Sequence, residues 1–146
     1  MTTIGSWLER RRELAPLLLR LFLAFVLMYG TADNVFSRAR MMEFRDFLAT
    51  NGFPWPHASA YLSAYAQFGT GILLLLGIWT RPAAAVVVVN FVVALAMVHV
   101  GAPFNANIAP LAMLVGGLFF VLYGAPRYSL DARLARRRGA ASVALP

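Results

Sequence analysis

The 146-residue chain contains no cysteine. It therefore forms no disulfide and offers no thiolate to a metal ion or an iron–sulfur cluster. For the same reason it carries out no thiol–disulfide exchange by itself. If the protein takes part in sulfur or thiol redox chemistry, we expect another subunit to supply the groups that handle the sulfur.

Charge is also scarce, and the positive charges are all arginine. Only 13% of the residues are charged, against about 25% in an average soluble domain, whereas 60% are hydrophobic. A water-facing globule of this size cannot bury so much apolar surface. The composition therefore predicts an integral membrane protein.

The basic excess does not indicate a nucleic-acid partner. The chain has 13 Arg, no Lys and a formal net charge of +7. Most of these Arg flank apolar segments, as topology signals do, and no basic stripe is interleaved with aromatic residues. We expect membrane lipid as a partner and no nucleic acid.

Four apolar segments are long enough to cross a bilayer as helices, for which about 20 residues are needed. Strands of a membrane barrel would alternate polar and apolar residues, and these segments do not. We predict an all-α integral membrane four-helix bundle in a single domain over residues 1–134, with a basic, disordered tail over 135–146. The predicted spans are residues 14–32, 60–79, 82–100 and 108–123.

A short amphipathic helix is predicted between spans one and two. Apolar residues recur there at helical spacing among charged residues, which is typical of an interfacial helix lying on the membrane surface. The apolar positions are Met41, Phe44, Phe47 and Leu48. Trp55 follows this segment and is expected to anchor the chain at the interface.

Arginine also predicts the orientation. Nine Arg outside the spans lie on the side of the two termini, and three lie on the other side. The positive-inside rule then places both termini of this multi-pass protein in the cytoplasm. The segment SLDARLARRRG after span four is expected to begin a short helix capped by Ser129.

Three polar side chains inside the spans, Arg20, Gln67 and Asn90, are candidates to bind a ligand or a quinone. For Arg20 the alternative to ligand binding is snorkelling, in which the aliphatic stem lets the guanidinium reach the membrane surface. Otherwise it is a buried cation paired with an acceptor or with an anionic group. The small Ala24 on the same helix face would let another helix approach.

Gln67 shares a helix face with Ser63 and Gly71, at spacings of four residues. This pattern is typical of helix packing with an interhelical hydrogen bond. The functional alternative is a hydrogen bond to a bound quinone, lipid or substrate carbonyl. Asn90 is expected to bond to Gln67 or to a backbone carbonyl. Gly116 with Ala112 four residues earlier predicts close packing inside the bundle or between protomers.

A second candidate cluster lies at the outer level and contains Asp33, His57 and His99. Any proton chemistry is expected there, because histidine changes its charge near neutral pH. The alternative is that these residues only mark the hydrated boundary of the membrane. Two His on separate segments indicate neither a metal site nor a haem, and we predict no metal and name no catalytic residue. His99 follows Asn90 by nine residues, about 180° around an ideal helix, so we predict that these two do not line the same pocket.

Three stretches of the chain form a specific combination: LAPLLLRLFLAFVLMYGTADNVF, AYAQFGTGILLLLGIWTRPAA and GAPRYSLDARL. Together with the NGFPWP segment before span two, their order and spacing resemble the DoxX family of small bacterial membrane proteins over about residues 14–134. The resemblance implies a four-helix membrane bundle in the bacterial inner membrane, and the bundle agrees with the count of spans.

The resemblance also implies redox chemistry. Relatives are associated with thiosulfate:quinone oxidoreductase, in which a membrane subunit passes electrons to quinone, and with complexes that have soluble thiol- or superoxide-handling partners. Arg20 matches the family's Arg in span one, and Asp33 matches its acidic position after that span. Gln67 departs from the Glu of relatives, and an amide does not titrate. The departure argues against proton transfer at this position.

We therefore expect a membrane subunit that supports a redox complex, by binding a quinone or by docking a soluble oxidoreductase. It would have no covalent cofactor and would be at most a quinone-interacting subunit of an enzyme. The alternative is a non-catalytic membrane anchor, assembly or cargo-binding protein, as a monomer or a homo-oligomer. A small transporter is less favoured, because broken helices and inverted repeats are missing.

Overall fold

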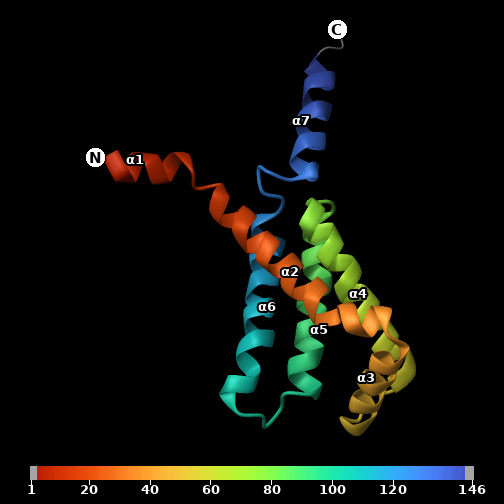
Figure 1. Ribbon diagram of the computed structural model, residues 1–146. Helices are drawn as coiled ribbons and strands as arrows, with labels where there is room; N and C mark the ends of the chain where they lie inside the picture. The colour runs from red at the N-terminus through yellow and green to blue at the C-terminus, as the bar shows by residue number, and fades with distance from the viewer. Residues whose placement is uncertain (1–2, 144–146) are drawn as a thin grey trace.

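The computed structural model describes residues 3–143, and every regular element in that part of the chain is a helix (Figure 1). The helices are α1 (Thr3–Arg10), α2 (Leu14–Phe36), α3 (Arg38–Thr50), α4 (Pro56–Leu76), α5 (Thr80–Met97), α6 (Phe104–Tyr123) and α7 (Leu130–Val143).

Four of these helices, α2, α4, α5 and α6, are long and apolar enough to cross a membrane. This confirms the four predicted spans of a multi-pass membrane protein. The predicted bounds differ from the helices by up to four residues: α4 and α6 each begin four residues earlier than predicted, and α4 and α5 each end three residues earlier. At its end α2 continues through Asp33 to Phe36. Polarity suggested an end at residue 32, but helical backbone bonding continues until the Ser37 N–H donates to the Asp33 carbonyl.

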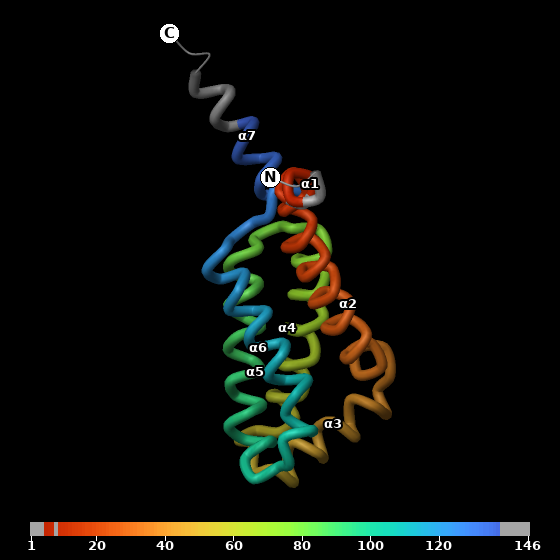
Figure 2. The backbone as a smooth tube through the Cα atoms, turned by 90° about the vertical axis from the view of Figure 1, so that its left-hand side faces the viewer, coloured from red at the N-terminus to blue at the C-terminus, as the bar shows by residue number. Residues whose placement is uncertain are grey.

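The spans form a bundle in which α2 packs against α4, α4 against α5 and α5 against α6, with a smaller contact between α2 and α6 (Figures 1 and 2). Almost fully buried apolar side chains from all four helices meet at its centre. The largest are Leu23, Leu27, Leu74, Val87 and Phe120. The predicted all-α membrane bundle is thus the fold of the chain.

Small residues allow the closest helix crossings. A Cβ at Gly71 of α4 would lie 3.2 Å from the Ala24 carbonyl oxygen and 2.6 Å from Met28 Cγ, both on α2. A Cβ at Gly116 of α6 would lie 2.7 Å from a methyl group of Leu23. The small-residue faces predicted on α2 and α6 therefore pack inside the bundle.

Helix α3 lies beside the first half of α4, at what we call the α3 end of the bundle (Figure 1). Met41 and Leu48 of α3 pack with Ala60 and Ala64 of α4 in a second buried cluster. A helix over the predicted amphipathic segment is therefore confirmed. Its position on a membrane surface remains a prediction.

The opposite end, which we call the terminal end, carries α1 and α7 (Figure 1). Helix α1 projects sideways from the start of α2, and α7 leaves the bundle roughly along its axis (Figure 1). Ser129 Oγ accepts a hydrogen bond from the Ala132 N–H at 3.1 Å, as predicted for a cap. Helix α7 then continues to Val143, through residues that the sequence assigns to a disordered tail; residues 144–146 lie outside the described part.

Candidate functional site

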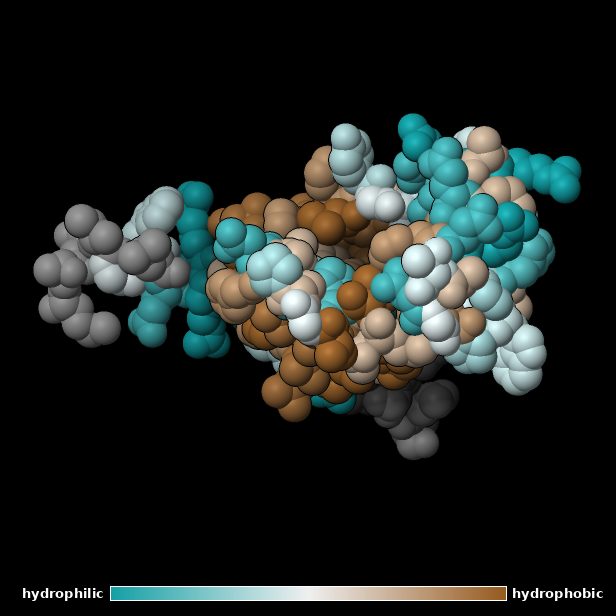
Figure 3. Space-filling model, turned by 90° about the horizontal axis from the view of Figure 1, so that it is seen from below, coloured by the Kyte–Doolittle hydropathy of each residue, from teal (hydrophilic) through white to brown (hydrophobic). Residues whose placement is uncertain are grey.

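A cavity of about 640 Å³ lies between α3, α4 and α5. Seen from the α3 end, hydrophobic residues border a recess between α3 and the end of the α5–α6 hairpin (Figure 3). The volume is within the range of about 300–1,000 Å³ that small-molecule sites occupy. The polar lining residues are Ser59, Ser63, Gln67, Asn90 and His99, and the others are Phe44, Phe47, Leu48, Phe53, Leu62, Ala66, Ala85, Val86, Val89, Phe91, Val93, Ala94 and Val98.

Three of the polar residues form a hydrogen-bonded row on the cavity wall, which we call the amide row. Gln67 Nε2 donates to Ser63 Oγ at 3.0 Å, and Ser63 Oγ donates to Asn90 Oδ1 at 2.9 Å. Ser63 and Gln67 meet because they are four residues apart on α4, and Asn90 reaches them from α5. The row confirms the predicted shared face of Ser63 and Gln67, and Asn90 joins Gln67 through the hydroxyl rather than directly.

The amide row leaves one acceptor and one donor free. Within residues 3–143, neither Gln67 Oε1 nor Asn90 Nδ2 has a hydrogen-bond partner. The buried side-chain atoms that lack a partner in that range are two atoms of Arg20 and one of Asn107. Since Gln67 and Asn90 line the cavity, their free ends are open to a ligand there.

His99 lines the same cavity as Asn90, so the prediction that these two do not share a pocket is wrong. That prediction treated the segment between them as one ideal helix, but α5 ends at Met97. The His99 N–H bonds to the carbonyl of Ala94, five residues earlier, at 3.3 Å. The chain has left the regular helix at that point, and helical periodicity no longer decides which way the side chain faces.

The cavity wall is apolar and uncharged apart from its few polar groups. None of the described lining residues is Asp, Glu or Arg. Phe44 and Phe47 of α3 stack with their ring centroids 6.5 Å apart and form an aromatic wall. Because a charged group would lose its hydration there without gaining a charged partner, the cavity suits a neutral ligand.

Arg20 is buried at the terminal end rather than in this cavity. Its side chain is 3% exposed, and Nη2 donates to the Tyr128 carbonyl oxygen at 2.9 Å. Arg20 is therefore a buried cation paired with an acceptor, and its guanidinium points toward the terminal end of the bundle. The Arg20 atoms Nε and Nη1 have no hydrogen-bond partner among the described residues.

The structure does not bring Arg20 together with Gln67 and Asn90. The Arg20 guanidinium lies directly over Gly77, where an added Cβ would overlap Nη1. Gln67 precedes Gly77 by ten residues, about 15 Å along a helix. Of the three predicted candidates, Gln67 and Asn90 therefore share the cavity, and Arg20 belongs to a separate polar cluster.

That cluster is organised by Asp131, a residue that the sequence analysis did not single out. Its Oδ1 accepts from the Trp79 N–H at 3.0 Å, and its Oδ2 accepts from the Thr80 N–H at 2.9 Å and the Thr80 hydroxyl at 3.0 Å. The Asp131 N–H donates to the Gly77 carbonyl at 3.0 Å. We call these four contacts the tail latch, because they fasten the start of α7 to the α4–α5 turn. The available signal was an acidic residue just after the Ser129 cap.

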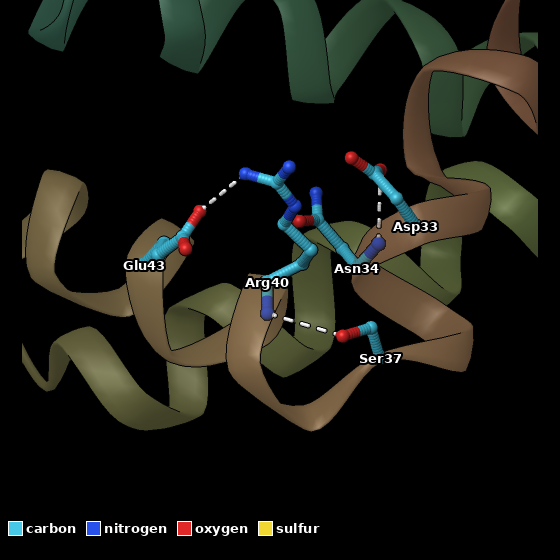
Figure 4. Close-up of polar contacts among 5 residues, drawn as sticks. All are labelled: Asp33, Asn34, Ser37, Arg40 and Glu43. Atoms are coloured by element: carbon cyan, nitrogen blue, oxygen red, sulfur yellow. Dashed lines mark hydrogen bonds and ion pairs between the residues drawn. The ribbon is translucent and has the colours of Figure 1, made fainter.

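Asp33 lies at the corner between α2 and α3, where local contacts hold it (Figure 4). Its Oδ1 accepts from the Asn34 N–H at 2.9 Å. On α3, Ser37 Oγ caps the helix by accepting from the Arg40 N–H at 3.4 Å, and Arg40 pairs with Glu43 at 2.8 Å. The hydrogen bond that Arg40 donates to the Glu43 carboxylate raises the pKa of the Arg40 guanidinium above its ordinary value.

The three residues of the predicted outer cluster come from three different segments. Asp33 is in the last turns of α2, His57 begins α4 and His99 follows α5. The His57 ring packs on Tyr61, with centroids 4.9 Å apart, and His99 alone of the three lines the cavity. Across residues 3–143 there is no group of three or more His, Cys, Asp or Glu side chains placed to hold a metal ion.

Comparison with known proteins gives one family. The family model described as DoxX matches residues 15–100, more than half of the chain. No curated protein and no solved structure matches the chain. The matched region includes Arg20 and every residue that lines the cavity, whereas Tyr128 and Asp131 lie beyond it.

Proposed function

The chain belongs to the DoxX family, and from that membership we propose that it is a membrane subunit of a redox complex that binds a quinone between α3, α4 and α5. The observation that carries the proposal is an apolar, uncharged cavity with the amide row on its wall. A quinone has a flat apolar ring and two carbonyl oxygens that accept hydrogen bonds. Asn90 Nδ2 is a free donor at the depth of the cavity where such a carbonyl would lie.

The shape of the cavity supports the same ligand class. Its lining residues run from Ala85 along α5 to Val98 and His99 just beyond the end of that helix. The helical part from Ala85 to Met97 is about 18 Å long. That length accommodates a ring together with part of an isoprenoid tail. The aromatic wall of Phe44 and Phe47 offers a surface against which a ring can stack.

We further propose that the protein lies in the bacterial inner membrane with its terminal end in the cytoplasm, as the distribution of Arg indicates. The cavity would then lie in the outer half of the bilayer. Because the chain has no cysteine, a partner would carry any thiol or sulfur chemistry and deliver electrons to the quinone.

The proposal is tested by titrating a short-tailed quinone into the purified protein in lipid nanodiscs. Asn90→Leu should weaken binding about fivefold to tenfold, the loss expected for one hydrogen bond of about 1 kcal/mol. Gln67→Leu should weaken it less, because the free Gln67 Oε1 only accepts and makes no hydrogen bond to a quinone carbonyl. Asn34→Leu on α2, an amide away from the cavity, should bind as the wild type does. Absence of saturable binding, or equal binding by all three variants, would overturn the proposal.

The second candidate is a non-catalytic anchor or assembly protein, and the tail latch favours it. Arg20 and Asp131 hold the terminal end together, which would present a fixed surface to a partner. The Asn90→Leu variant, purified together with its natural partner, distinguishes the two functions. Retained complex with lost quinone-dependent turnover supports the redox subunit; unchanged turnover supports the anchor.

A further inference from the structure

A second polar depression lies at the terminal end, away from the quinone cavity. It is an open groove of about 750 Å³, which we call the headgroup groove. We infer that it binds the headgroup of a zwitterionic phospholipid, a phosphodiester joined to a primary ammonium group. Its lining residues are Ser6, Glu9, Arg10, Arg12, Glu13 and Arg127.

The position of the groove indicates a lipid rather than a soluble anion. Glu13 immediately precedes α2, and Arg127 closely follows α6. Just inside those helices, Leu18 of α2 is 65% exposed and Leu122 of α6 is 79% exposed. The groove therefore lies where the apolar surface of the bundle gives way to polar residues, which is the level of lipid headgroups.

Helix α1, which supplies half of the lining, has the features of an interfacial helix. It runs sideways from the start of α2, roughly perpendicular to the bundle axis (Figure 1). Trp7 is 48% exposed, and the Arg11 guanidinium lies 4.5 Å from its ring centroid. Tryptophan with an adjacent arginine is typical of the boundary between membrane and water.

The charges of the groove specify both halves of the headgroup. Glu13 is already engaged, since it accepts from the Tyr123 hydroxyl at 3.1 Å and lies 4.0 Å from Arg12. Arg10, Arg127 and Glu9 make no ion pair with any described residue. Two free cations suit one phosphodiester, because guanidinium groups bind its oxygens through charge-assisted hydrogen bonds.

Glu9 decides between lipid classes. A purely anionic headgroup would place its negative charge beside this carboxylate, whereas a primary ammonium supplies three N–H donors to it. A trimethylammonium group has no N–H to donate. The expected order of affinity is therefore phosphatidylethanolamine first, with phosphatidylglycerol and phosphatidylcholine weaker.

The inference is tested by native mass spectrometry of the full chain in detergent, with the three lipids added at matched acyl composition. The first phosphatidylethanolamine should bind at least about tenfold more tightly than the first phosphatidylglycerol, as for one charge-assisted hydrogen bond. Glu9→Gln should abolish this preference. The double variant Arg10→Ala/Arg127→Ala should weaken the first lipid of every class about tenfold or more.

The control is Arg133→Ala/Arg136→Ala on α7, which removes the same charge at the same end of the bundle. It should leave the first binding step unchanged. Equal weakening by both double variants would reduce the effect to general electrostatics and overturn the site. A tighter first phosphatidylglycerol, or displacement of the lipid by millimolar inorganic phosphate, would overturn the assignment of a zwitterionic lipid.

Discussion

The terminal end of the bundle depends on the absence of a side chain at residue 77. Gly77 has a φ of +68°, and a Cβ there would overlap Arg20 Nη1 and lie 2.6 Å from Ser129 Cβ. The Arg20 guanidinium therefore occupies the volume that any other residue at this position would fill. Because Arg20 is buried, its side chain has no open space into which it can retreat.

We predict that Gly77→Ala destabilises the protein more than the backbone conformation alone would. A left-handed φ costs a non-glycine residue about 1–3 kcal/mol, and displacement of Arg20 adds to that cost. Gly52→Ala is the matched control, because Gly52 has a φ of +74° and nothing within 4 Å of its Cβ position. Thermal unfolding in detergent should show a larger loss for residue 77; equal losses would show that the contact with Arg20 carries no energy.

Residue-level prediction succeeded where partners are close in sequence and failed where they are distant. Ser63 and Gln67 are four residues apart, so helical spacing was enough to place them on one face. The acceptor of Arg20 is a backbone carbonyl 108 positions away, and no side-chain pattern marks a carbonyl. The sequence thus left Arg20 between two alternatives that only packing separates.

At the level of elements, the α4–α5 turn is strained and is held from outside. Trp79 has a φ of +49°, a left-handed conformation that is uncommon for a side chain of this size. No side chain of the turn itself caps α5. Asp131 supplies that cap from α7 by accepting from the Trp79 and Thr80 amides.

We predict that Asp131→Ala opens the first turn of α5. Loss of a cap costs about 1–2 kcal/mol, which corresponds to roughly 5- to 30-fold faster hydrogen exchange at the Trp79 and Thr80 amides. Asp46→Ala is the control, because that exposed carboxylate on α3 pairs with its neighbour Arg45. Unchanged exchange at residues 79 and 80 would mean that the turn holds its conformation without the tail.

The elements themselves were largely predictable, because long apolar runs can only be spanning helices in lipid. The residues at which the helices begin and end were less predictable. Hydropathy stopped the first span before Asp33, although polar residues continue a helix readily beyond the apolar zone. The same limit produced the error at His99, since the sequence does not mark Met97 as the last helical residue of α5.

For the molecule as a whole, the two ends of the bundle differ in charge and in what they carry. The terminal end has α1, α7, the tail latch and the headgroup groove; the other end has α3 and the cavity that α3 lines with α4 and α5. Composition and the four apolar segments predicted a membrane bundle. They could not predict the cavity, which depends on the way α3 folds back beside α4.

We predict that the terminal end faces the cytoplasm and the α3 end faces outward. The natural absence of cysteine makes this measurable with single introduced thiols at exposed positions. Thr50→Cys and Asn105→Cys should react with a membrane-impermeant maleimide on intact cells, whereas Arg136→Cys should react only after lysis. The reverse pattern of labelling would invert the proposed orientation.

The tail latch also imposes an order on biosynthesis. Asp131 lies 51 positions after Thr80, so α4 and α5 leave the ribosome well before the carboxylate that fastens their turn. A nascent chain interrupted after α6 has all four spans but an uncapped hairpin. The α4–α5 turn therefore receives its cap only after the four spanning helices have been synthesised.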